Sequence, residues 1–166
     1  MSSRLLYDTR DNSILRCQPE PKGSAGLPSF NGLCKSARVP EDEKEYLDTI
    51  VVSGDYLTHT MQDDFRIVEI DNEIQVKEKP KVIILPSTTE LDTSVNNILT
   101  IDINIQNILI IDNITSVDMR INDINFSIDI ADNTGSMEVE LQEVDTYEVA
   151  CTEDRFISQP AIVEVV

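Results

Sequence analysis

The sequence predicts a mostly β protein in which an antiparallel β-sandwich follows a smaller, irregular β-rich domain with one short helix. Between residues 81 and 166, apolar and polar residues alternate in repeated short runs, as expected for strands with one buried and one solvated face. Four of the five glycines precede residue 81, whereas isoleucine is concentrated after it. Because the charged, proline-containing stretch Lys77–Lys81 separates the two compositions, we expect one domain over residues 1–80 and the sandwich over residues 81–166.

The first domain opens with a predicted hairpin. Its strands are the short apolar runs Leu5–Tyr7 and Ile14–Cys17, and the polar stretch between them is typical of a turn. The following stretch, Gln18–Pro40, holds four prolines and three glycines in 23 residues. Such a composition disfavours regular structure, so we expect an extended, irregular arm there.

A short helix and a second hairpin are predicted to complete the first domain. The helix spans Pro40–Leu47, because proline suits the first helical position and three carboxylates follow it, where they complement the helix dipole. The runs Thr49–Val52, Phe65–Ile70 and Glu73–Lys77 are strand-like. The last two are separated by an Asp-Asn pair, which favours a tight hairpin turn.

Seven alternating runs predict the strands of the second domain. They recur at intervals of roughly 10–15 residues with Asp/Asn-rich turns between them, which is typical of an antiparallel sandwich rather than of βαβ units. A parallel solenoid is the alternative, but no fixed repeat period supports it. The runs are Val82–Leu85, Ile98–Gln106, Val117–Ile121, Ile124–Ile130, Ser136–Leu141, Tyr147–Cys151 and Ala161–Val166.

The charge balance argues against two classes of partner. The chain carries 13 basic and 31 acidic side chains, a net charge of −18. Nucleic-acid binding requires a basic surface, and attraction to anionic membranes does too. No apolar run is long enough to cross a bilayer, and the first residues lack the apolar core of a secretory signal. We therefore expect neither nucleic acid nor membrane as a partner.

Residues that could support catalysis or metal binding are few. His59 is the single histidine, and no nucleophile motif accompanies it, so we interpret it as a surface or packing residue. The acidic turns could supply oxygen ligands to Ca²⁺, but they lack the spacing of a calcium loop and Asp and Asn are also common turn residues. We expect no catalytic site, no cofactor and no metal site. The acidic turn residues are Asp112, Asp118, Asp123, Asp129 and Asp132.

The three cysteines do not form a metal-binding pattern. Cys17, Cys34 and Cys151 are widely spaced, so reduced, partly buried thiols are the simplest interpretation. A bridge between Cys17 and Cys34 is the alternative, and it would require an oxidising compartment.

The stretch Asp132–Cys151 has the order turn, strand, short connection, tyrosine, strand. This order resembles the E–F corner of immunoglobulin-like domains, in which a tyrosine at the start of strand F bonds back to the upstream backbone. The resemblance covers Val82–Val166 and implies that the Tyr147 hydroxyl contacts the backbone around Leu141–Val144. Val149 stands where antibody domains have a cysteine, and there is no tryptophan, so the similarity is to bacterial and phage modules.

The start of the chain carries a second resemblance. The tyrosine-led hairpin Leu6–Leu15 is similar to the openings of accessory proteins of tailed-bacteriophage virions. A Pro-rich arm followed by an acidic immunoglobulin-like module also resembles phage decoration and tail-surface proteins. We therefore expect a structural, non-enzymatic protein on the virion surface, assembled in the host cytoplasm.

The resemblance implies how such a protein would be organised. The N-terminal half would bind the particle, through the major capsid protein or tail proteins, as a homo-oligomer or part of a larger assembly. The immunoglobulin-like half would project outwards and stabilise the particle or attach weakly to a host-surface ligand. Two alternatives stay open: a tail, neck or baseplate component, and a bacterial immunoglobulin-like cell-surface adhesion module.

Within the expected arm, three apolar side chains are candidates for contact with a neighbouring subunit. Leu27, Phe30 and Leu33 stand isolated among polar and special residues. Isolated apolar groups gain free energy only when they enter an apolar groove, so we expect these residues to bind the partner.

Overall fold

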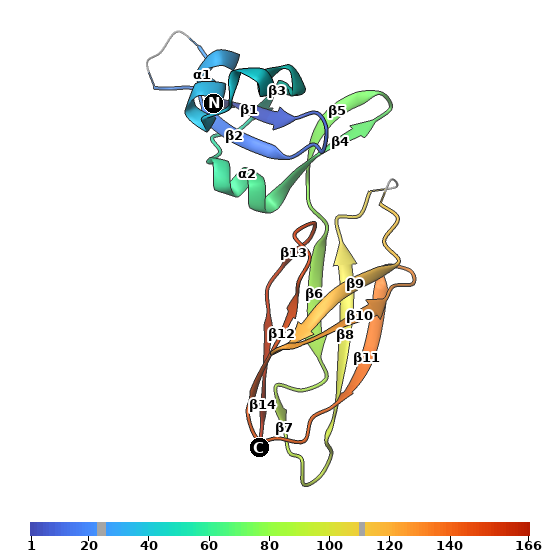
Figure 1. The fold of residues 1–166 in the computed structure, drawn as a ribbon. Helices are drawn as coiled ribbons and strands as arrows, with labels where there is room; N and C mark the ends of the chain where they lie inside the picture. Colours follow the sequence, from blue (N-terminus) through green and yellow to red (C-terminus); the bar gives the residue numbers. More distant parts are fainter. Residues whose placement is uncertain (23–25, 110–111) are drawn as a thin grey trace. The chain divides into compact units, whose positions relative to one another are not determined.

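The computed structural model describes residues 1–22, 26–109 and 112–166 and divides the chain into two compact units, Met1–Glu78 and Lys79–Val166. The boundary lies two residues before the one expected from the sequence. The chain is mostly β, as predicted (Figure 1). Each unit has buried hydrophobic clusters of its own.

A three-stranded antiparallel sheet forms the centre of the first unit, with the strand order β2-β1-β3. The predicted opening hairpin is confirmed as β1 and β2, and the predicted third strand as β3. Their bounds are Ser2–Asp8 for β1, Ile14–Pro19 for β2 and Leu47–Ser53 for β3.

One face of this sheet packs against a helix and the second hairpin. The helix α2 spans Thr58–Asp64 and was not predicted, whereas the hairpin of β4 (Phe65–Ile70) and β5 (Glu73–Glu78) was. Asp71 and Asn72 turn the chain with φ of 55° and 62°, the left-handed backbone of a tight hairpin. The buried cluster on this face contains Leu5, Tyr7, Ile14, Cys17, Met61 and Ile67.

The opposite face packs against a helix inside the expected arm. The structure places helix α1 at Phe30–Ala37, so the prediction of an irregular arm over Gln18–Pro40 is wrong for these residues; residues 23–25 lie outside the described parts. The Ser29 side chain caps the helix by accepting from Gly32 N–H, and Arg38 ends it with φ 59°. The cluster on this face contains Leu6, Leu33, Cys34 and Leu47.

The short helix expected after the arm is present as one 3₁₀ segment. It spans Glu41–Tyr46, with Pro40 at its N-cap, and β3 begins directly after it. The acidic residues of its first turn complement the positive end of the helix, as the sequence predicted.

Two packed sheets make up the second unit. One has the order β10-β9-β12-β14-β7 and the other β11-β8-β6-β13. All seven predicted runs form strands, and two further strands of two residues each were missed. The bounds are β6 Lys81–Pro86, β7 Glu90–Leu91, β8 Ile98–Gln106, β9 Ser116–Ile121, β10 Ile124–Asp129, β11 Thr134–Glu140, β12 Thr146–Cys151, β13 Ile157–Ser158 and β14 Ala161–Val165.

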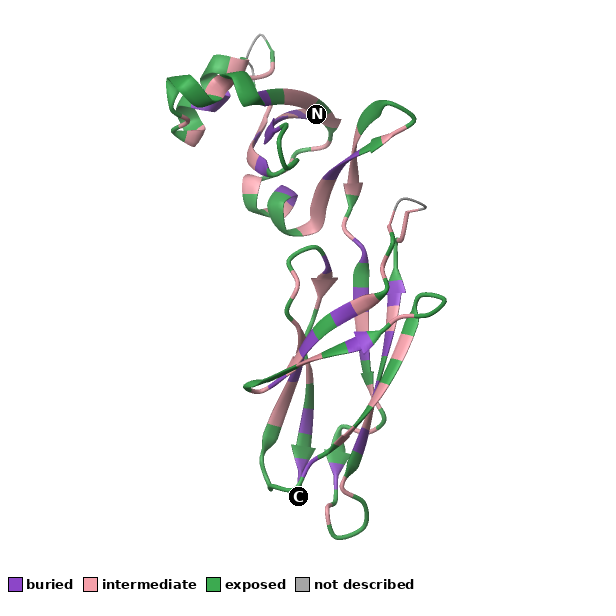
Figure 2. Ribbon diagram, turned by 45° about the vertical axis from the view of Figure 1, so that its right-hand side comes forward, coloured by how far each residue is buried: buried purple, intermediate pink, exposed green. Residues whose placement is uncertain are grey.

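Because side chains alternate across a strand, every second residue along these strands points into a common core. In β8, every second residue from Leu99 to Ile105 is buried. Buried and exposed positions alternate along other strands as well (Figure 2). Among the described residues, 16 buried side chains from both sheets and their connections form the core, which is the arrangement of a β-sandwich.

The strand order of the sandwich is immunoglobulin-like. Strands β9, β12 and β14 lie side by side as C, F and G do, and β6, β8 and β11 follow the order A, B, E, with β10 in the place of C′. The first and last strands each divide between the two sheets, so β6 pairs with β13 and β7 with β14. Both of these short pairs are parallel, while the other strand pairs of the described sandwich are antiparallel, as predicted.

The tyrosine corner is confirmed. The Tyr147 hydroxyl donates to the Glu143 carbonyl oxygen at 3.2 Å, within the predicted stretch of backbone. The ring packs against the sandwich core, where it is half-buried. One side chain thus ties the start of β12 to the connection that precedes it.

Candidate functional site

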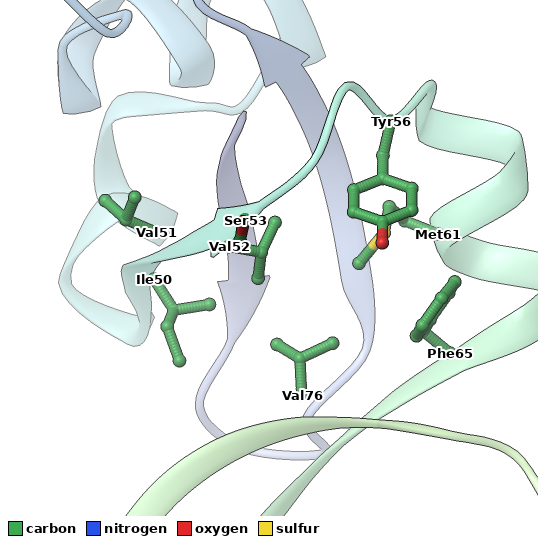
Figure 3. A pocket seen from close by; sticks show the side chains of 8 residues that line it. All are labelled: Ile50, Val51, Val52, Ser53, Tyr56, Met61, Phe65 and Val76. Carbon is green, nitrogen blue, oxygen red and sulfur yellow. The ribbon is translucent and has the colours of Figure 1, made fainter. Parts of the chain in front are cut away.

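An open recess of about 300 Å³ lies beside β3 in the first unit. In Figure 3, Ile50 and Val52 lie on one side of it and Tyr56, Met61 and Phe65 on the other, while the Val51 side chain points away. Its size suits one or two apolar side chains rather than a large ligand. The lining residues are Ile50, Val51, Val52, Ser53, Tyr56, Met61, Phe65 and Val76.

The turn after β3 places Tyr56 at the recess. Gly54 has φ of 127°, a backbone conformation that other residues rarely adopt. A Cβ at this position would lie 2.3 Å from Cε2 of Tyr56, so only glycine allows the ring to lie over the turn. The fully buried Ser3 hydroxyl holds the same turn: it donates to Gly54 O at 2.8 Å and accepts from Tyr56 N–H at 3.1 Å.

Aromatic and aliphatic contacts hold the other side of the recess. The rings of Tyr56 and Phe65 meet edge to face with centroids 5.4 Å apart, an arrangement favoured by the ring quadrupoles. Met61 on α2 is fully buried behind them, and Val76 on β5 is half-buried. The recess therefore has a packed, preformed lining of apolar side chains.

Hydrogen bonds beyond both ends of β3 establish which of its backbone groups face outward. At one end Gly54 N–H donates to Met1 O at 3.0 Å, and at the other Thr9 N–H donates to Tyr46 O at 2.8 Å. Bonded pairs alternate in an antiparallel ladder. The even-numbered residues of β3 therefore direct their backbone groups towards β1, and the odd-numbered residues direct theirs away from the sheet.

The outward backbone of β3 is open at its C-terminal end. The Thr49 N–H is satisfied by the Asp48 carboxylate at 2.7 Å. For the N–H groups of Val51 and Ser53, the described parts of the chain provide no hydrogen-bond partner. Val51 is 51% exposed, so this edge can be reached from solvent.

The opposite edge of the same sheet is closed. Thr58 on α2 bonds both backbone groups of Cys17, accepting from its N–H at 3.1 Å and donating to its carbonyl at 2.9 Å. The Gln62 amide donates to Ile14 O at 2.7 Å, and Pro19 has no N–H. Side chains and proline are common protections against unwanted strand pairing, and β2 has both.

The three side chains expected to bind a partner do not line this recess. Leu33 is fully buried in the cluster under α1, so its predicted role as a partner contact is wrong: it forms part of its own core. Phe30 is half-buried against the same cluster, and Leu27 is half-buried in the segment that precedes α1. The recess escaped prediction because its lining comes from β3, α2, β4, β5 and a turn, which only the fold brings together.

The polar residues considered for chemistry are spread over the surface. His59 is exposed on α2. Within the described residues, no group of three or more His, Cys, Asp or Glu side chains is placed to hold a metal ion. Several of the Asp and Asn residues in turns adopt positive φ, which is the turn-forming role that their sequence also allowed. In the second unit these are Asn107, Asn122, Asp132 and Asn133, whereas Asp118 and Asp129, expected in turns, lie in strands β9 and β10.

All three cysteines are free thiols. Cys17 packs on one face of the first sheet and Cys34 on the other, so the alternative of a bridge between them is not realised. Burial raises the pKa of each thiol, Cys151 included, which disfavours the reactive thiolate.

A second recess lies on the sandwich, between β9, β10 and the end of β12. Asp118, Asn125, Phe126 and Thr152 line about 420 Å³. Thr152 Oγ1 donates to the Asp118 carbonyl at 3.2 Å, and the Asp118 N–H donates to Glu153 Oε1 at 2.8 Å. These backbone groups are already satisfied within the unit, unlike those at the edge of β3.

None of the helices in the described parts of the chain is long and apolar enough to cross a membrane. Comparisons with protein-family models, with curated proteins and with solved structures found no match for this chain.

Proposed function

We propose that this chain is a non-enzymatic structural protein of a tailed-phage particle, in which the first unit attaches to a particle protein and the immunoglobulin-like unit projects. The observation that carries the proposal is the open β3 edge beside an apolar recess in the first unit. Apolar concavities next to unsatisfied backbone groups favour protein partners, because both features gain free energy when they are covered.

The second unit supports a projecting role. Its edge strand β11 exposes Glu138 and Glu140, and charged side chains on an edge disfavour pairing with another chain. The residues from Lys79 to Val166 carry 4 basic and 16 acidic side chains, a net charge of −12. Such a charge keeps a module soluble and separate from other acidic surfaces.

The first test asks whether the chain attaches to the head, as a capsid decoration protein would. The full chain is mixed with particles assembled from the virion genes that neighbour its coding sequence, and the particles are sedimented. We expect the chain to sediment with heads. Sedimentation with tails alone would move the protein to the tail, neck or baseplate and overturn the head assignment.

Two variants in one hairpin connect binding to the recess. Val76→Glu places a charge at the recess, whereas Ile74→Glu places it two residues earlier on β5, at a side chain that is 38% exposed. We expect Val76→Glu to lose co-sedimentation and Ile74→Glu to retain it, with hydrogen exchange confirming that both are folded. A chain that sediments with neither heads nor tails, or a folded Val76→Glu variant that binds as well as the wild type, would overturn the proposal.

A further inference from the structure

We propose that the β3 edge binds its partner by strand addition, and that the added segment is extended, apolar at alternate positions and basic at its ends. This inference rests on the proposed function, since it names how the first unit attaches. The added strand would extend the sheet order to four strands, beyond β3, and place side chains from one of its faces in the recess.

Backbone geometry supplies the first argument. Val51 and Ser53 direct their backbone groups away from β1, and their N–H groups have no partner in the described residues. An incoming strand would satisfy these groups without any change in β3. The closed β2 edge shows the contrast, because Thr58 and Gln62 already occupy the equivalent groups there.

Side-chain alternation supplies the second argument. Ile50 and Val52 face the recess, whereas Val51 lies on the opposite face of the sheet and is exposed. Side chains of an added strand alternate in the same way. Apolar residues at alternate positions would therefore fill the recess beside Tyr56 and Val76, and the residues between them would lie beside Val51.

Charge supplies the third argument and selects the occupant. Exposed carboxylates lie at both ends of the open edge, Asp48 near the start of β3 and Asp55 just after its end. A second copy paired antiparallel about Val51 would place Asp48 of one chain opposite Gly54 of the other, one residue from its Asp55, and two chains of net charge −18 would repel. A segment with basic ends complements the same carboxylates.

The test uses the full chain and a synthetic nine-residue probe with valine at alternate positions, threonine between them and lysine at both ends. Binding is followed by fluorescence anisotropy, and hydrogen exchange resolves individual amides. We expect saturable binding that slows exchange at Val51 and Ser53. Because the Val52 N–H already faces β1, its exchange serves as the internal reference.

Variants of the probe separate the three arguments. Two N-methylated probes, one for each register, keep all side chains, and each loses the N–H donors at one of the two sets of alternate positions. We expect the probe that lacks the donors facing β3 to bind at least about tenfold more weakly. A probe with glutamate in place of lysine should also bind about tenfold more weakly at low salt, with the difference shrinking as salt is added.

Variants of the protein provide the matched control. Val51→Pro removes an outward N–H that the fold does not use, and proline is tolerated at such edge positions. We expect it to weaken probe binding about tenfold, while Val51→Thr, which keeps the N–H and the β-branched shape, binds like the wild type.

The outcomes distinguish this inference from the proposed function. If both N-methylated registers bind as tightly as the parent probe, or if Val51 exchange does not slow, strand addition is overturned, although co-sedimentation with particles could still hold. Sedimentation equilibrium of the full chain that shows a dimer with protected Val51 would also overturn it, because the occupant would then be a second copy.

Discussion

The two units bury their apolar residues in different ways. Among the described residues, the second unit gathers 16 buried residues between two sheets, whereas the first divides six and four between the two faces of one sheet. Each small cluster depends on a short helix for its cover, α2 on one face and α1 on the other. The first unit therefore has less apolar packing behind any one element, and part of its sheet stays open.

Leu33→Ala tests this difference and should give the largest effect. The side chain is fully buried in a cluster of four buried residues, and its truncation leaves a cavity that costs about 2–5 kcal/mol. Hydrogen exchange of the full chain should show faster exchange in α1 and β1 and unchanged exchange in β8. If β8 exchanges faster as well, the two units do not unfold separately.

Leu99→Ala is the matched control in the second unit. Leu99 is also fully buried, so the cost should be of the same order. Its effect should appear in β8 and its neighbours and leave α1 unchanged. The two variants together measure how far the units are independent.

How much of each unit could be predicted from the sequence follows from the same contrast. In the sandwich, strict alternation such as that of Leu99–Ile105 carries the burial pattern directly, and the corner at Tyr147 adds a local motif. The two-residue strands β7 and β13 were missed because two residues cannot display a period. Their parallel pairing depends on how the sheets close, which is a property of the whole sandwich.

In the first unit, tertiary contacts outweighed composition. Prolines and glycines suggested an irregular arm, yet Ser29 provides an N-cap and Leu33, Cys34 and Ala37 have helical spacing. That local pattern could have identified α1. The recess could not have been identified in this way, because no local pattern places Tyr56 against Phe65 or shows that β3 lies at an edge.

Tyr147→Phe tests the corner hydrogen bond of the second unit and should have a smaller effect than the core variants. It removes the hydroxyl bond to Glu143 and keeps the ring, so the free energy of unfolding should fall by about 0.5–1.5 kcal/mol. Urea denaturation measures this change. Tyr46→Phe in the first unit serves as control: its ring lies under Arg10, and the substitution keeps that contact, so the change should stay within about 0.5 kcal/mol. An equal loss in both variants would remove the special role of the corner.

The smallest expected effect is on the pH dependence of stability, which one carboxylate in each unit should change in that unit alone. Side-chain hydrogen bonds from Arg10, one of them 2.9 Å from Arg10 Nε to Asp8 Oδ1, lower the pKa of Asp8 from 3.8 to about 2. A pKa lowered by folding stabilises the folded state fully above the ordinary value, and this stability is lost as pH falls through the lowered one. The first unit should therefore lose stability between pH of about 4 and about 2. Asp8→Asn should be less stable at neutral pH, and its free energy of unfolding should vary less across that window, as measured by urea denaturation with hydrogen exchange in β1.

Asp92→Asn is the counterpart in the second unit, where a side-chain hydrogen bond from Ser94 lowers the pKa of Asp92. Its effect should be confined to the sandwich, and a change in β1 exchange would contradict the independence of the two units.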